Sequence, residues 1–232
     1  MLTRLVRERE AAAGPSRVPV LLAFMHGRSK LRLGELDSAD HWLARVGKVR
    51  DGSLKNWFPT AEAQLRLDQG KLPEARAAIG QLPGGLPGRR ATAAMLRARL
   101  LRAEGDPAGA SRLLEGELGT LYRESTKTLS LFTLPLVTAG EWRLAAGDPR
   151  GADSFARLGR SAAALDSLAL SRSALAGRAE LLLARALHTE QDRPAARAAA
   201  ERAIVALANG YGADHQWTRW ARALRDSLSS ER

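Results

Sequence analysis

One short pattern, repeated five times, constrains the fold of this chain more than any other feature. Each copy has two stretches with the apolar spacing of a helix, separated by a turn residue with a polar or charged residue beside it. An alanine stands five residues after every turn residue. The turn residues are Gly34, Gly70, Gly105, Gly147 and Gln191, and the alanines are Ala39, Ala75, Ala110, Ala152 and Ala196. The pattern predicts five helical hairpins.

Each part of the pattern has a physical reason. A glycine adopts the left-handed conformation that ends a helix, and an aspartate beside it caps the next one. In the last copy, Asp192 is predicted to cap the second helix and Pro194 to lie in its first turn, where a missing N–H costs little. The alanine then lies one turn inside the second helix, facing the first, where a small side chain lets two helices touch.

The spacing of the copies predicts a stacked array. The turn residues at positions 34, 70, 105, 147 and 191 are 36, 35, 42 and 44 residues apart. A period between about 20 and 50 residues is typical of solenoids, in which each unit covers the apolar face of the next. Apolar residues make up 45% of the chain but aromatic residues only 5%, which favours close helix packing and an all-α fold.

The pattern resembles the tetratricopeptide repeat (TPR). The last copy resembles it most, with Ala184 and Ala196 at the helix contact and Ala203 near the end of the unit. Earlier copies offer the pairs Gly27 and Ala39, Ala98 and Ala110, and Gly140 and Ala152. The resemblance implies a right-handed superhelical solenoid of stacked antiparallel helix pairs.

The chain also departs from the common repeat. The usual aromatic residues between the helices are mostly absent, and the proline that closes a unit is irregular. The later units exceed the usual ~34 residues. They resemble the long repeats of the kinesin-light-chain type, which also occur behind regulatory domains in bacteria.

The limits of the repeat region divide the chain into three predicted segments. Residues 1–16 are predicted to form an N-terminal helix, which would be half of a hairpin that begins upstream. Residues 17–208 are predicted to form the five hairpins, and residues 209–232 a capping helix with Trp217, Ala221, Leu224 and Leu228 on one face. An uncapped solenoid end leaves apolar surface in water, so the N-terminal segment is also a candidate surface for a homo-oligomer.

The sequence shows no chemistry for catalysis. Cysteine is absent, and none of the four histidines lies three to five residues from another, as metal sites of the helical or finger type require. We therefore predict no enzyme activity, no metal and no cofactor. The glycines and arginines of residues 84–90 lack the signature of a nucleotide loop and are expected to form a connector. The one apolar run, Val18 to Met25, is too short to span a membrane, and we expect a cytoplasmic protein.

The predicted ligand surface lies on the first helices of the hairpins. The resemblance implies that these helices line a concave groove that holds a peptide or partner protein. Stacking is expected to align the residues six positions before each turn residue, which include Glu141. The candidate ligand residues are Arg28, Arg32, Gln64, Arg99, Arg102 and Arg185.

Two functions stay open for a chain of net charge +11. Guanidinium groups bind carboxylates in bidentate fashion, so the first is a scaffold that binds an acidic peptide or partner. Such a scaffold would suit the sensor or docking arm of a bacterial signalling or transcription system. The second is nonspecific binding of nucleic acid, which the charge favours but which lacks regularly placed aromatic residues for base stacking. A simpler alternative is that the arginine stems only cover apolar surface.

Overall fold

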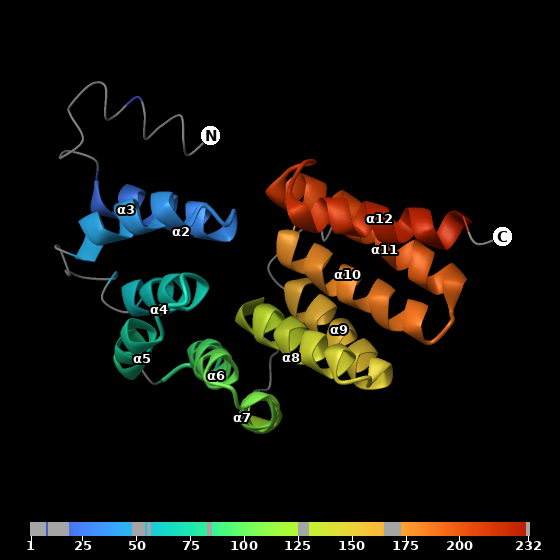
Figure 1. Cartoon of the computed structure of the whole chain (residues 1–232), viewed down its shortest axis with the longest axis horizontal. Coiled ribbons are helices and arrows are strands. Elements are labelled where there is room, and N and C mark those ends of the chain that lie inside the picture. Colours follow the sequence, from blue (N-terminus) through green and yellow to red (C-terminus); the bar gives the residue numbers. More distant parts are fainter. Residues whose placement is uncertain are drawn as a thin grey trace. The chain divides into compact units, whose positions relative to one another are not determined.

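The fold was analysed in a computed structural model that describes residues 8, 19–47, 54, 57–82, 85–124, 130–164 and 173–230. These residues form eleven α-helices, one short 3-10 helix (η3, Ser130–Phe132) and no strand, which confirms the predicted all-α class (Figure 1). The helices are α2 (Val20–Arg32), α3 (Leu36–Gly47), α4 (Phe58–Asp68), α5 (Leu72–Gly80), α6 (Pro87–Ala103), α7 (Pro107–Glu124), α8 (Thr133–Ala145), α9 (Pro149–Ala164), α10 (Ala174–Thr189), α11 (Arg193–Tyr211) and α12 (Gln216–Ser230).

The helices belong to two compact units. The first comprises Met1–Gly84 and Arg99–Pro107, and the second comprises Gly85–Ala98 and Ala108–Arg232. The helix α6 therefore contributes to both. The predicted helix over residues 1–16 lies outside the described residues, apart from Glu8.

The five predicted turns share one geometry. The four glycines have φ between 72° and 95°, and Gln191 has φ 66°. At each turn the N–H of the turn residue donates to the carbonyl three residues earlier, and the next N–H donates to the carbonyl five residues earlier. This is the Schellman pattern, which satisfies the last carbonyls of a helix and requires a left-handed residue. The predicted left-handed glycines are confirmed.

The predicted small residues lie where helices approach most closely. All five alanines that follow the turns are fully buried. A Cβ added at Gly140 of α8 would lie 3.0 Å from Phe155 Cβ of α9 and 2.5 Å from Leu182 Cδ2 of α10. A Cβ on Gly27 of α2 would lie 3.0 Å from Leu43 Cγ of α3. Since only a hydrogen fits at these positions, the small residues set the distance between the helices.

The predicted cap of α11 is also confirmed. The Asp192 carboxylate accepts a hydrogen bond from the Ala195 N–H at 3.2 Å, and Pro194 lies in the first turn. Residues 84–90 differ from the prediction of a connector, since α6 already begins at Pro87. Proline fits the first turn of a helix, and Thr92 Oγ1 donates to the Gly88 carbonyl inside it.

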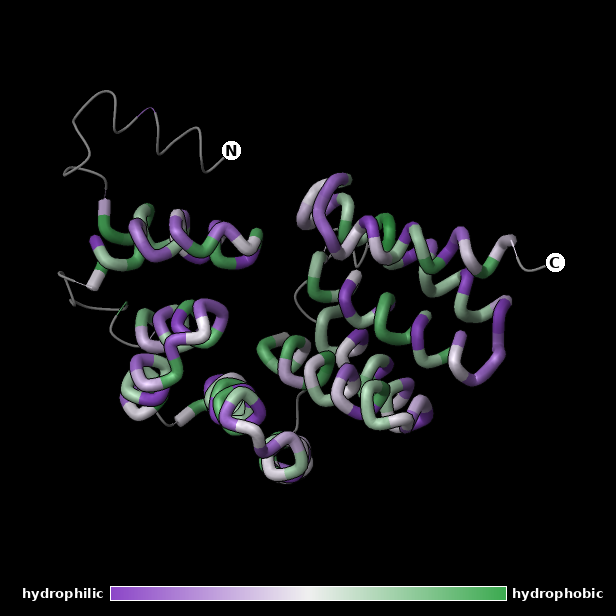
Figure 2. Tube along the Cα trace, in the orientation of Figure 1, coloured by the Kyte–Doolittle hydropathy of each residue, from purple (hydrophilic) through white to green (hydrophobic). Residues whose placement is uncertain are grey.

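Each unit has its own core. In the first unit, aromatic side chains gather between α2, α3 and α4, with Phe24, Trp42 and Phe58 buried together. In the second, alanine and leucine side chains of α8 to α12 fill the core, among them Leu183 and Leu187 of α10. Apolar and polar residues alternate along most helices (Figure 2), as expected of helices with one apolar side.

The last helix covers the end of the α10–α11 hairpin. Ala221 and Leu228 of α12 are buried, and Trp217 and Leu224 pack against the same core. Trp220, which is 54% exposed, lies beside this apolar face and meets Trp217 edge to face at 4.8 Å between ring centroids.

Candidate functional site

A stripe of side chains on α2 combines exposed apolar residues with uncompensated positive charge. Leu21, Met25, Arg28 and Arg32 follow one another at intervals of four, three and four residues, so they share one face of the helix. Leu21 is 59% exposed and Met25 47% exposed, which is unusual for large apolar side chains. We refer to these four residues as the α2 stripe.

Packing holds the Arg28 guanidinium in place. It lies 5.6 Å from the Phe24 ring centroid and 5.9 Å from that of Trp57, within the range of a cation–π contact. Burial lowers the pKa of Arg28, and the charge of Arg32 lowers it further. Within the described part of the chain, neither arginine has a carboxylate partner, so their mutual repulsion is not relieved.

The other predicted ligand residues fall in different settings. Gln64 is half-buried on α4 and Arg102 is exposed at the end of α6, both in the first unit with Arg28, Arg32 and Arg99. Arg185 is exposed on α10 in the second unit. The Arg99 guanidinium lies 2.6 Å from Asp68 Oδ1 of α4. Arg99 thus already has an acidic partner, whereas no carboxylate of the described residues pairs with Arg28 or Arg32 of the α2 stripe.

Sequence reasoning did not foresee that many arginines bind acids on a neighbouring helix. Arg66 of α4 donates to Asp40 of α3 at 2.8 Å, and Arg178 of α10 donates to Glu141 of α8 at 2.9 Å. Arg143 of α8 donates from Nε to Glu115 of α7 at 2.7 Å. Hydrogen bonding to Glu115 raises the pKa of Arg143. These pairs give the arginines a structural role, which differs from the simpler alternative that their stems only cover apolar surface while the charged heads stay in water.

The Arg178 side chain also connects three helices of the second unit. Besides its bond to Glu141, its guanidinium lies 4.4 Å from the ring centroid of Trp217 on α12. A carboxylate, a guanidinium and an indole therefore form a chain from α8 through α10 to α12. Such a contact orders the first helices of consecutive hairpins without a large aromatic core.

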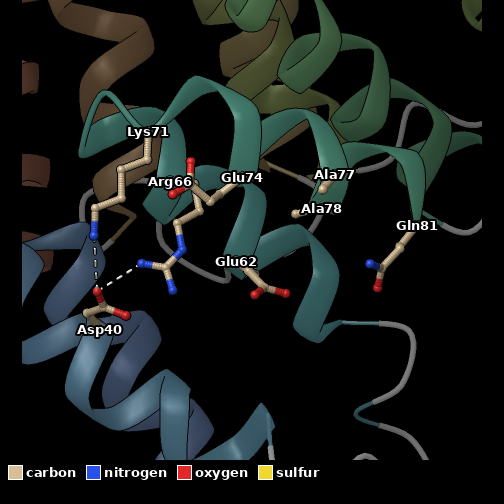
Figure 3. Close-up of a pocket in the computed structure, with 8 residues that line it drawn as sticks. All are labelled: Asp40, Glu62, Arg66, Lys71, Glu74, Ala77, Ala78 and Gln81. Atoms are coloured by element: carbon tan, nitrogen blue, oxygen red, sulfur yellow. Dashed lines mark hydrogen bonds and ion pairs between the residues drawn. The ribbon is translucent and has the colours of Figure 1, made fainter.

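A polar hollow of about 460 Å³ lies among α3, α4 and α5 of the first unit (Figure 3). It is lined by Asp40, Glu62, Arg66, Lys71, Glu74, Ala77, Ala78 and Gln81. Burial alone would raise the pKa of Asp40, but hydrogen bonds from Arg66 and Gln69 and the nearby charge of Lys71 hold it below its usual value. The sequence analysis missed this hollow. No signal in the sequence singles it out, because charged residues also occupy the matching positions of other copies, such as Lys30 and Arg97.

The described residues contain no group of three or more histidine, aspartate or glutamate side chains arranged to hold a metal ion. Among the helices that the structure describes, none combines the length and the apolar character that crossing a membrane requires.

The geometry of hairpins, turns and buried alanines defines the class: the chain has a TPR-like helical repeat fold. It is similar to BtubC (BKLC) from P. vanneervenii, a kinesin light chain-like TPR protein, with a TM-score of 0.52 and 15% sequence identity. The match covers 92% of each chain. No family model and no curated protein matches the sequence.

Proposed function

We propose that this chain is a non-catalytic scaffold that binds an acidic peptide or partner protein through the first helices of its hairpins. The observation that carries the acidic chemistry is the α2 stripe, in which no carboxylate of the described residues pairs with Arg28 or Arg32. A carboxylate placed there would relieve the repulsion between Arg28 and Arg32 and form charge-assisted hydrogen bonds.

The apolar half of the stripe adds a second requirement. Met25 lies one turn and Leu21 two turns before Arg28 on the same face, so apolar and acidic groups are expected at matching positions of the ligand. A short helix with leucine or phenylalanine followed by glutamate or aspartate would satisfy both halves. Gln64 extends the proposed surface on α4, the first helix of the next hairpin in the same unit, and Arg185 offers a separate contact on α10 of the other unit.

The proposal also includes the cellular system in which this scaffold works. The length of the later repeats resembles a subtype found behind bacterial regulatory domains, which suggests the docking arm of a cytoplasmic signalling or transcription system. Nonspecific binding of nucleic acid is the competing function. The internal ion pairs argue against it, because they neutralise many of the arginines that would otherwise contact phosphate.

The test compares two double variants that remove the same charge. Arg28→Gln with Arg32→Gln neutralises the α2 stripe. Arg97→Gln with Arg112→Gln neutralises two exposed arginines that pair with no acid among the described residues. Each purified chain would retain proteins from nuclease-treated lysate of its own cells, and binding of each identified partner would be repeated with purified components.

The scaffold proposal expects a discrete partner whose affinity falls about tenfold in the stripe variant and stays unchanged in the control. Equal losses in both variants, with retained material that disappears after nuclease or moderate salt, would instead assign the binding to bulk charge and nucleic acid.

A further inference from the structure

The polar hollow of the first unit is lined by two charged residues of α4 whose counterparts in the fifth hairpin are leucines. Counted back from the turn residue, Glu62 and Arg66 occupy positions eight and four before Gly70. The same positions before Gln191 hold Leu183 and Leu187, which are buried in the core of the second unit. The second hairpin therefore has two charged side chains where the fifth has leucines.

The positive charges of the hollow are already engaged. Arg66 donates to Asp40 at 2.8 Å and to Gln69 Oε1 at 2.8 Å, and Lys71 Nζ lies 3.9 Å from the same Asp40 carboxylate. Gln69 donates a further hydrogen bond to Asp40 at 3.0 Å. Asp40 is thus fully partnered, and the two cations face it rather than the open space (Figure 3).

The negative charges of the hollow are not all engaged. Glu62 on α4 and Glu74 on α5 have no hydrogen bond or ion pair with any described residue. Figure 3 shows the Glu62 carboxylate and the Gln81 amide pointing to the open side of the hollow, with Ala77 and Ala78 in the adjoining wall. One end of the hollow is therefore an unpaired carboxylate beside an amide oxygen and a methyl-lined surface.

We propose that this hollow binds the guanidinium group of an arginine side chain from a partner protein. A guanidinium is planar and carries several donors, so it can reach the Glu62 carboxylate and the Gln81 amide oxygen together. The alanine methyl groups suit the apolar stem of the same side chain. Glu74 adds a second negative charge. The site is separate from the α2 stripe and selects the opposite charge.

The probe is a blocked tripeptide, acetyl-Gly-Arg-Gly-amide, added to the full chain labelled with ¹⁵N in buffer of low ionic strength. The control peptide replaces arginine by citrulline, which has the same shape without the charge. We expect saturable shifts of the amide signals of Glu62, Glu74 and Gln81 with the arginine peptide, and at least tenfold weaker binding of the citrulline peptide.

Two variants locate the site. Glu62→Gln keeps the volume and removes the charge, and it should weaken binding at least tenfold. Glu201→Gln makes the same change at a half-exposed glutamate of α11 that pairs with Arg197, and it should leave binding unchanged. Circular dichroism melts would show that both variants fold.

Three results would overturn the proposal. One is equal binding of the arginine and citrulline peptides, and another is wild-type affinity in folded Glu62→Gln. The third is a response of the same amides to inorganic phosphate but not to the arginine peptide, which would make the hollow an anion site through Arg66 and Lys71.

Discussion

At the scale of single residues, one turn departs from the other four. Gln191 holds a left-handed conformation with φ 66°, where the other turns have glycine. Side chains with a Cβ pay roughly 1–2 kcal/mol for this conformation. The Schellman hydrogen bonds at Leu187 and His188 keep it in place nonetheless. The fifth turn therefore carries a conformational cost that the others avoid.

Exchanging residues between turns tests this cost. Gln191→Gly should stabilise the chain by about 1 kcal/mol, and Gly70→Gln should destabilise it by a similar amount, since nothing lies within 4 Å of a Cβ added at Gly70. Urea unfolding followed by circular dichroism measures both. A destabilised Gln191→Gly variant would mean that the glutamine side chain makes a compensating contact.

A buried carboxylate in α10 makes a second test. Glu180 is 5% exposed, and its oxygens lie 3.4 Å from Arg160 of α9 and 3.0 Å from Arg202 of α11. Glu180→Gln should lower the free energy of unfolding by about 1–3 kcal/mol, because it removes the charge that both arginines share. Denaturant unfolding measures the loss.

The matched control is Glu201→Gln, whose glutamate forms an exposed pair with Arg197 four residues earlier. It should cost no more than about 0.5 kcal/mol. Equal losses in the two variants would show that burial of the Glu180 carboxylate contributes nothing.

Residue-scale features were the most predictable from the sequence. The left-handed glycines, the buried alanines and the Asp192 cap follow from the local chemistry of a helical hairpin. The acidic partners of the arginines could not be predicted from this local chemistry. Arg66 and Asp40 are 26 residues apart, and their distance depends on how one hairpin packs on the next. Sequence spacing alone does not fix that packing.

At the scale of elements, the side chain of His215 contributes to holding the start of α12 in place. His215 Nδ1 accepts a hydrogen bond from the Trp217 N–H at 3.3 Å, and its ring stacks on Tyr211 of α11 at 4.6 Å between centroids. An acceptor at Nδ1 requires the neutral ring. Burial lowers the pKa of His215, and the charge of Arg219 lowers it further. Asp214, beside it in the chain, is the nearest acid in sequence.

The lowered pKa predicts that acid weakens the attachment of α12. A histidine whose pKa is lower folded than unfolded contributes full stability above its unfolded value near 6.5. That contribution is lost as the pH falls through the folded pKa. Fluorescence of Trp217 and Trp220 during urea unfolding between pH 7.5 and pH 5 would measure the loss.

The variant His215→Asn isolates this residue from the other histidines. Asparagine keeps a cap acceptor for the helix but does not titrate. The difference in unfolding free energy between the two chains should therefore be constant above pH 6.5 and change below it. A constant difference across the whole range would remove His215 as the source.

Element boundaries were less predictable than turns. The glycines and arginines of residues 84–90 indicated a connector, yet α6 begins at Pro87. Two arginines in the first turns of α6 interact unfavourably with the helix dipole. The residues around Pro87 therefore did not indicate the start of a helix. Arg90 forms an ion pair with Glu124 of α7 at 2.7 Å, and this contact from a distant residue offsets the unfavourable position.

At the scale of the whole molecule, stability should be local to each unit. In repeat proteins each hairpin interacts with its neighbours, so a change in one hairpin is felt mostly nearby. Gln191→Gly should slow amide exchange in α10, α11 and α12 more than in α2 to α5 of the other unit. Hydrogen–deuterium exchange with mass spectrometry measures this. Equal slowing in all helices would indicate one cooperative fold.

The repeat architecture was predictable at this scale, but the binding sites were only partly so. The interval of the turns predicted stacked hairpins, and the fold comparison supports a TPR-like array. The α2 stripe contains two predicted residues, Arg28 and Arg32. The hollow escaped prediction because charged residues at the positions of Glu62 and Arg66 also occur in other copies, and only the packing of α3, α4 and α5 shows the space between them.

The ion pairs between helices restrict which hairpins of this array could be lost or duplicated during evolution. Tandem repeats commonly gain or lose copies by recombination, which an apolar interface tolerates because any copy fits any other. Here Asp40 is matched to Arg66, Glu115 to Arg143, and Glu141 to Arg178. Removing one hairpin would separate such partners and leave charges facing apolar or like-charged neighbours. The hairpins are therefore not interchangeable, because each of these ion pairs joins two particular neighbours.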